Sequence, residues 1–273
     1  MDYLFSKSCR GFAHLRNGKP CQDDSLCYQD KQRVILTCCD GHGGDLYVRS
    51  DRGSRFASEA LFRVCRDLTS NFLAKYKGKE AEEKIKMEIL CEWGRLVGED
   101  IAHHAFTKKE LEPLDEHQRE ILLANPIKAY GSTMAGAMVL DGKLVLAGIG
   151  DTECLLLRQG TLVRPLEDED DPAGNITYSL CQDDAYAYIR VKVLNLRGYD
   201  GVLLCTDGFS GPFQSYANLL DSFVKPLMKK TILGQSIAYV NDFVSELAAS
   251  RGSGDDVSLS FFLKGDANIR KYR

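Results

Sequence analysis

Hydrophobic positions along this chain follow two patterns: short apolar runs bounded by turn residues, and longer stretches with a helical period. The short runs predict strands, which we place at 3–5, 11–14, 25–28, 34–39, 133–140, 144–149, 154–158, 162–166, 187–196, 201–205 and 257–263. Turn signals such as Asn17-Gly18 and Asp141-Gly142 separate neighbouring runs. These tight turns indicate antiparallel pairing of consecutive strands.

The helical period covers residues 45–125. Apolar residues recur every three or four positions over 48–68 and again over 80–97, with charged residues between them. A long antiparallel helix pair is the expected product. Residues 108–125 are polar and fit either a third short helix or a loop.

Strands and helices alternate in blocks along the chain, and two further helices are expected at 219–228 and 235–249. This order predicts an α+β fold, an antiparallel β-sandwich flanked by helices in four layers, α-β-β-α. No linker divides the chain, so residues 1–273 are expected to form a single domain, with the helical pair inserted between β segments. The acidic stretch 167–175 is expected to be an exposed loop.

Composition narrows the class of protein. Hydrophobic residues make up 44% and charged residues 27% of the chain, as in soluble globular proteins. A formal net charge of −4 gives no indication of nucleic-acid binding. No apolar run is long enough to span a membrane, and the first residues lack the pattern of a secretory signal. We therefore expect a cytoplasmic monomer with no nucleic-acid or membrane partner.

The cysteines favour the same compartment. None of the ten has Cys-x-x-Cys spacing, which argues against a zinc site. Cys38, Cys154 and Cys205 fall inside predicted strands, where a free thiol packs as a small hydrophobe. We expect reduced core thiols in a reducing environment.

Aspartates stand at the ends of several predicted strands. Asp40, Asp151 and Asp207 each follow an apolar run, and Asp255 and Asp256 precede another. A buried strand holds such a side chain rigidly, and carboxylates crowded together repel one another unless a cation neutralises them. Ligands that are all oxygen suit Mg²⁺ or Mn²⁺ rather than zinc. The pattern predicts one shared acidic site.

Five short motifs occur along the chain: Asp-Gly-His-Gly-Gly at 40–44, Gly-Ser-Thr at 131–133, Gly-Asp-Thr at 150–152, Asp-Gly at 207–208 and Asp-Asp at 255–256. In this order they resemble the motifs of the type 2C family of metal-dependent protein phosphatases, and two departures from the usual motifs resemble a divergent, bacterial-type branch of it. The resemblance implies a helix-flanked β-sandwich that hydrolyses phosphoserine and phosphothreonine in proteins. A phosphoprotein substrate and a cognate serine/threonine kinase are the partners it implies.

The resemblance also implies a role for each matching metal ligand. Asp40 corresponds to the carboxylate that bridges two Mn²⁺ or Mg²⁺ ions, with the Gly41 carbonyl as a further ligand. Asp207 and Asp255 correspond to ligands of the first ion. Asp151, together with Asp207, corresponds to an acid that helps to hold a third, weaker ion in some members.

The family resemblance also implies which residues transfer the proton and form the N-terminal acid motif. His42 corresponds to the proposed general acid that protonates the leaving oxygen while a metal-bridging water attacks phosphorus. The acid motif reads Gln22-Asp23-Asp24, and either Asp23 or Asp24 corresponds to its acidic ligand. Asp256 stands where the family usually has asparagine and is a further candidate metal ligand.

Relatives place an arginine, which binds the substrate phosphate, four residues before the first acid of that motif. If Asp23 is that acid, the corresponding residue is Lys19, and the nearest upstream arginine is Arg16. Lysine supplies a point charge without the bidentate fork of arginine. It is equally open that Lys19 and Arg16 are ordinary residues on the rim of a hairpin turn and do not bind phosphate.

The altered acid motif leaves a second function open. A catalytically weak or inactive relative, a pseudophosphatase, would keep the fold and bind phosphoproteins without turnover. Retention of Asp40, Asp207 and Asp255 favours the enzyme.

Overall fold

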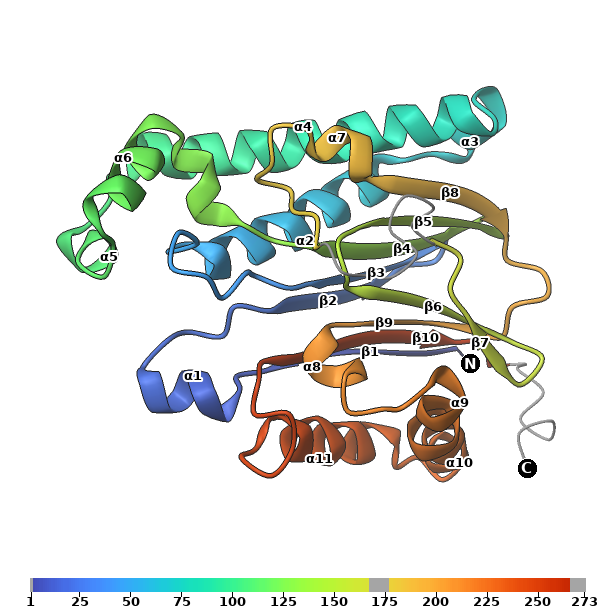
Figure 1. Cartoon of the computed structure of the whole chain (residues 1–273). Helices are drawn as coiled ribbons and strands as arrows, with labels where there is room; N and C mark the ends of the chain where they lie inside the picture. The colour runs from blue at the N-terminus through green and yellow to red at the C-terminus, as the bar shows by residue number, and fades with distance from the viewer. Residues whose placement is uncertain (1, 167–176, 266–273) are drawn as a thin grey trace.

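The computed structural model describes residues 2–166 and 177–265, and it contains two five-stranded antiparallel sheets packed face to face (Figure 1). The first sheet has the strand order β1-β10-β9-β6-β7, with bounds Tyr3–Cys9, Val257–Leu263, Gly201–Cys205, Glu153–Arg158 and Thr161–Val163. The second has the order β2-β3-β4-β5-β8, with bounds Asp24–Gln29, Arg33–Cys39, Met134–Leu140, Lys143–Ile149 and Arg190–Asn195. The predicted β-sandwich is confirmed.

Helices cover both outer faces of the sandwich (Figure 1). The long helices α2 (Ser50–Asp67) and α4 (Lys79–His103) run antiparallel over the second sheet, as expected. The same side carries α3 (Ser70–Lys75), α5 (Lys108–Leu111), α6 (Glu116–Ala124), the 3₁₀ helix η1 (Pro126–Tyr130) and α7 (Ala185–Tyr188). The other side carries α8 (Asp207–Ser210), α9 (Tyr216–Leu219), the π-helical turn η2 (Leu220–Val224), α10 (Lys225–Ile232) and α11 (Ser236–Ala248).

Three apolar cores hold the four layers together. One lies between the second sheet and α2–α4, one between the two sheets, and one between the first sheet and the helices of the C-terminal half. Because side chains alternate along a strand, Ile35 of β3 packs in the helical core and Leu36 in the core between the sheets. Burial on both faces explains why β3 reads as a continuous apolar run.

The segment predicted as a strand at 11–14 is instead part of helix α1 (Phe12–Asn17), and that prediction was wrong. The Asn17-Gly18 pair ends this helix rather than turning a hairpin. Gly18 has a φ of 66° and its N–H is directed to the last-turn carbonyls of His14 and Leu15, a common glycine helix end.

Other boundaries shift by a few residues. The segment predicted as a strand from 187 begins with α7, and β8 starts only at Arg190. Strand β7 is shorter than the predicted 162–166. At 108–125 two short helices form, each begun by a capping box, Thr107 with Glu110 and Asp115 with Gln118. The loop predicted at 167–175 lies outside the described residues.

Six of the ten cysteines are buried, Cys9, Cys21 and Cys27 are partly buried, and Cys91 is exposed. All ten cysteines lie in the described part of the chain and are free thiols. Trp93 is buried in the helical core, and its indole N–H donates to the Gly53 carbonyl at 3.3 Å. Among the described helices, none has the length and apolar character needed to cross a bilayer.

Arg49, directly before α2, is strongly buried in the helical layer, with 2% of its surface exposed. Its guanidinium donates to Glu110 at 2.6 Å, to the Tyr130 hydroxyl at 2.7 Å and to the carbonyls of His104 and Ala105 at 2.9 Å. These bonds tie the α4–α5 connection to the start of α2.

Replacing Arg49 by leucine would leave the partly buried Glu110 carboxylate without its partner. We expect Arg49→Leu to lower the free energy of unfolding by about 3–5 kcal/mol in a urea titration. Arg66→Leu, which removes an exposed arginine paired with Asp67, should cost less than about 1 kcal/mol. Equal losses in the two variants would contradict this role for Arg49.

Candidate functional site

A pocket of about 220 Å³ opens where β2, β4 and β10 begin and β3, β5 and β9 end. It gathers six of the seven predicted acidic residues, together with Gly41 and His42, from segments far apart in the sequence. The residues that line it are His14, Gln22, Asp23, Asp40, Gly41, His42, Gly43, Thr133, Asp151, Thr177, Asp207, Asp255 and Asp256.

Asp40 and Asp207 lie at the centre of the electrostatics. Burial raises the pKa of Asp40 well above its ordinary value, and the charges of Asp23, Asp207 and Asp151 raise it further. Burial also raises the pKa of Asp207, with Asp151 and Asp255 adding to the effect. Asp40 and Asp207 interact directly, in a way that raises the pKa of Asp40 and lowers that of Asp207, so a proton is held more readily on Asp40 than on Asp207. The pocket therefore holds more carboxylates than can all be ionised without a bound cation.

Asp23 and Asp24 point in opposite directions, as successive residues entering a strand do. Asp23 lies in the pocket and accepts a hydrogen bond from the Thr206 hydroxyl at 2.8 Å. Burial, with the charge of Asp256 adding to it, raises the pKa of Asp23 to about 8. Asp24 is not among the residues that line the pocket, and it faces Ser58 and Arg55 of α2. Of the two aspartates, Asp23 is therefore the one that reaches the site.

Asp256 joins the two ends of the chain at the pocket. Its Oδ1 accepts from the Gly11 N–H at 2.7 Å, and its Oδ2 accepts from the Gln22 N–H at 2.5 Å and from Nδ1 of His14 at 2.8 Å. Both oxygens thus already have protein donors, which gives Asp256 a positioning role beside its predicted role as a ligand. His14 is not among the predicted site residues, because its segment is predicted to be a strand.

Asp151 and Asp255 complete the acidic wall. Asp151 follows Gly150, whose φ of 81° turns the chain sharply at the end of β5. The Thr177 hydroxyl donates to Asp151 at 2.8 Å. Asp255 accepts the N–H of the following residue at 2.8 Å just before β10 begins. Both carboxylates are therefore held at the pocket by local chain geometry.

His42 lies in the wall beside Tyr47, with ring centroids 4.8 Å apart. Its backbone N–H donates to the Gly131 carbonyl at 3.1 Å. A Cβ at residue 131 would come within 2.7 Å of the imidazole, so glycine there leaves the ring its space. Burial lowers the pKa of His42, opposed by the charge of Asp151, which favours the neutral imidazole.

The two cations predicted to hold phosphate lie elsewhere. Among the described residues that line the pocket there is no lysine or arginine. Arg16 and Lys19 are exposed, on α1 and on the turn that follows it.

The donor set of the pocket fits a hard divalent cation. All its candidate ligands are oxygens, which Mg²⁺ and Mn²⁺ prefer. The buried Oε1 of Gln22 has no hydrogen-bond partner among the described residues, so it is a further free oxygen beside the carboxylates. Within the described residues, no three Asp, Glu, His or Cys side chains converge closely enough to form a preassembled metal site.

Comparison with known families identifies the chain. The family described as Protein phosphatase 2C matches residues 10–237, most of the sequence. The chain belongs to the protein phosphatase 2C family. A comparison with curated proteins found no match.

Solved phosphatases of bacteria share the fold. The serine/threonine phosphatase Stp1 from Staphylococcus aureus is 17% identical, with a TM-score of 0.62 over 97% of this chain and 95% of its own. PppA of Pseudomonas aeruginosa is 17% identical, with a TM-score of 0.60 over 96% and 97%. The catalytic domain of PstP, in complex with two manganese ions, is 19% identical, with a TM-score of 0.61 over 96% and 97%. At these identities the likeness establishes the fold.

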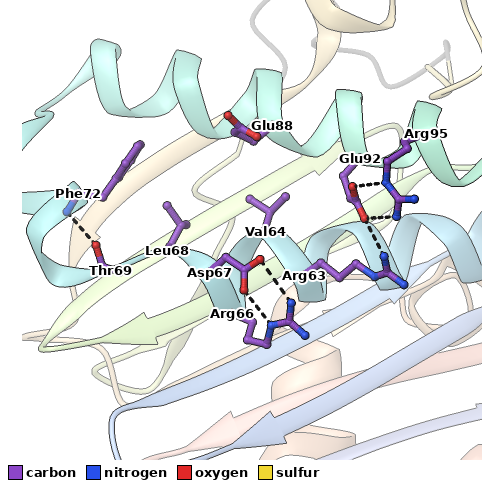
Figure 2. A pocket seen from close by; sticks show the side chains of 10 residues that line it. All are labelled: Arg63, Val64, Arg66, Asp67, Leu68, Thr69, Phe72, Glu88, Glu92 and Arg95. Carbon is purple, nitrogen blue, oxygen red and sulfur yellow. Dashed lines mark hydrogen bonds and ion pairs between the residues drawn. The ribbon is translucent and has the colours of Figure 1, made fainter.

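A second pocket, of about 480 Å³, lies between the end of α2 and the middle of α4, and it shares no lining residue with the acidic pocket (Figure 2). Val64, Leu68 and Phe72 contribute its apolar side chains. Its three arginines, Arg63, Arg66 and Arg95, each form an ion pair with a neighbouring acid. Figure 2 shows Arg63 and Arg95 bound to Glu92, and Arg66 bound to Asp67. The groove therefore has no unpaired arginine to attract an anion.

The raised pKa of Asp23 predicts a pH dependence of the metal-free protein. The folded-state pKa of about 8 exceeds the unfolded value of about 3.9. Between these values the folded protein binds more protons than the unfolded one, so stability falls as pH rises from about 4 to 8. We expect the Tm in excess EDTA to fall over this range and Asp23→Asn to flatten the slope. A Tm that rises with pH in EDTA would contradict the crowding of the carboxylates.

Proposed function

We propose that this chain is an Mg²⁺- or Mn²⁺-dependent protein serine/threonine phosphatase that hydrolyses phosphoserine and phosphothreonine in proteins. The observation that carries the proposal is the excess of buried carboxylates in one pocket of a protein phosphatase 2C family member. Such a pocket is stable in its ionised form only when cations are bound, and the same cations attract a phosphate group. Two ions, with a third held more weakly, are the expected complement.

Asp40, the Gly41 carbonyl, Asp207 and Asp255 would hold the two principal ions, and Asp151 with Asp207 a third. A divalent cation in such a site supplies a water nucleophile at neutral pH and neutralises charge that develops on the phosphate oxygens. The protein's own part is positional. Strand ends fix the carboxylates, and the hydrogen bonds of Asp256 hold the Gln22–Asp23 segment against them.

His42 is proposed to protonate the leaving oxygen. Its pKa is lowered by burial, so a nearby negative charge must raise it before the imidazole can carry a proton at neutral pH. Asp151 already acts in that direction, and the dianionic phosphate of the substrate would add to it. Because the described lining contains no lysine or arginine, the bound cations and His42 are the only positive partners we assign to the phosphate.

Metal dependence tests the proposal directly. Hydrolysis of p-nitrophenyl phosphate and of a phosphothreonine peptide should require Mn²⁺ or Mg²⁺ and stop in excess EDTA. Asp40→Asn and Asp207→Asn should each lower kcat at least about a hundredfold, since they remove ligands of the ions. Asp242→Asn, at an exposed acid of α11, is the matched control and should leave kcat unchanged. Equal activity in EDTA would overturn the proposal, and phosphopeptide binding without turnover at any metal concentration would favour the pseudophosphatase.

Substrates with different leaving groups distinguish a proton-donating role of His42 from a positioning role. His42→Ala should slow phosphothreonine peptides by about 10²–10⁴-fold, because an alkoxide leaving group needs a proton. Hydrolysis of p-nitrophenyl phosphate should fall much less, because p-nitrophenolate leaves without one. Losses of the same size on both substrates would assign His42 a positioning role only.

A further inference from the structure

Helix α1 and the turn after it present apolar side chains to solvent beside the acidic pocket. Phe12 is 39% and Leu15 is 52% exposed, and no residue of this helix is buried. We define residues 10–19 as the α1 rim. In Figure 1 the helix projects from one end of the sandwich, with its outer side uncovered.

The α1 rim is also the basic border of an acidic site. It contains Arg10, Arg16 and Lys19 and no aspartate or glutamate. None of these three cations forms an ion pair with an acid of the described residues; Arg16 instead lies over the Phe12 ring at 5.9 Å, and Arg10 donates to the Lys19 carbonyl at 3.3 Å. The arginines of the α2–α4 groove, by contrast, are all paired.

The rim is physically continuous with the pocket. At 100° per residue, Phe12, Leu15 and Arg16 share one face of the helix, and His14 lies on the opposite face. His14 lines the pocket and is bound to Asp256 at 2.8 Å. The Ala13 N–H donates to the Gly254 carbonyl at 2.9 Å, which adds a second anchor. One face of α1 is thus fixed to the site while the other is available to a partner.

We propose that the α1 rim binds the substrate chain next to its phosphorylated residue and selects phosphoproteins with an apolar residue and acidic residues at that flank. This inference rests on the proposed function. Once its cations are bound, the pocket attracts the phosphate, but for acidic residues beside the phosphate its described lining offers six aspartates and no lysine or arginine, and like charges repel. Unpaired cations on the rim offset that repulsion, and Phe12 and Leu15 offer an apolar contact.

The experiment compares substrates that reach the rim with one that does not. Two phosphothreonine peptides are assayed beside p-nitrophenyl phosphate. The acidic peptide has acidic residues flanking the phosphothreonine, and the amide peptide has the corresponding amides at those positions and is otherwise identical. Arg16→Glu should raise KM for the acidic peptide by roughly three- to tenfold, and leave the amide peptide and p-nitrophenyl phosphate within about twofold. Phe12→Ala/Leu15→Ala should raise KM for both peptides and not for p-nitrophenyl phosphate.

Matched controls stand elsewhere on the surface. Lys31→Glu makes the same kind of charge reversal in the β2–β3 turn, at the far end of the hairpin from the pocket. Leu233→Ala/Ile237→Ala removes two exposed apolar side chains at the α10–α11 turn. Both controls should leave every KM unchanged. Unchanged peptide KM values in the rim variants, or equal losses on peptides and p-nitrophenyl phosphate, would overturn the inference.

Failure of the proposed function gives a different result. If the wild type hydrolyses nothing with Mn²⁺ or Mg²⁺, binding of the fluorescent acidic phosphopeptide is followed by anisotropy in the same variants. A higher Kd for Arg16→Glu than for Lys31→Glu would still support the α1 rim as the binding surface. Equal Kd values would overturn it.

Discussion

Repulsion among buried carboxylates is the constraint on which this site depends. Burial raises the pKa values of Asp23, Asp40 and Asp207, and the charges of neighbouring aspartates in the pocket raise each of them further. Folding brings them together because Asp40 and Asp207 follow the buried strands β3 and β9, and Asp23 precedes β2, which pairs with β3. The free energy from burial of those strands offsets the electrostatic cost of the pocket, and a bound cation would convert that cost into affinity.

The pocket also depends on how the chain closes on itself. Strand β1 pairs with β10 along its whole length, which brings Gly11 and Asp256 together. The carboxylate of Asp256 then anchors His14 of α1 and the N–H of Gln22. Pairing of the two ends of the chain therefore sets the positions of both Asp23 and the basic α1 rim. The contacts that complete the first sheet thus also determine which side chains border the pocket.

Sequence patterns predicted the sandwich well because β3, β5, β9 and β10 are buried on both faces and read as unbroken apolar runs. They failed at 11–14, where an Asn-Gly pair signals either a hairpin or a helix end, and only the partner segments decide between them. The choice between Asp23 and Asp24 likewise depended on which face of β2 meets the pocket. His14 was missed because the position of α1 relative to Asp256 is set by long-range pairing that local patterns do not contain. Arg16 and Lys19 were candidates for the phosphate only through the family resemblance, and neither lines the pocket.

Proton release on metal binding tests the central claim most directly. Titration of the metal-free protein with Mn²⁺ at pH 7, by calorimetry in buffers with different ionisation enthalpies, counts the protons displaced per molecule. Crowded carboxylates that hold protons must lose them when the cation binds, so about one or more protons should be released, and Asp207→Asn should reduce both the number and the affinity. Tight binding with no proton release, or no binding at all, would contradict the account.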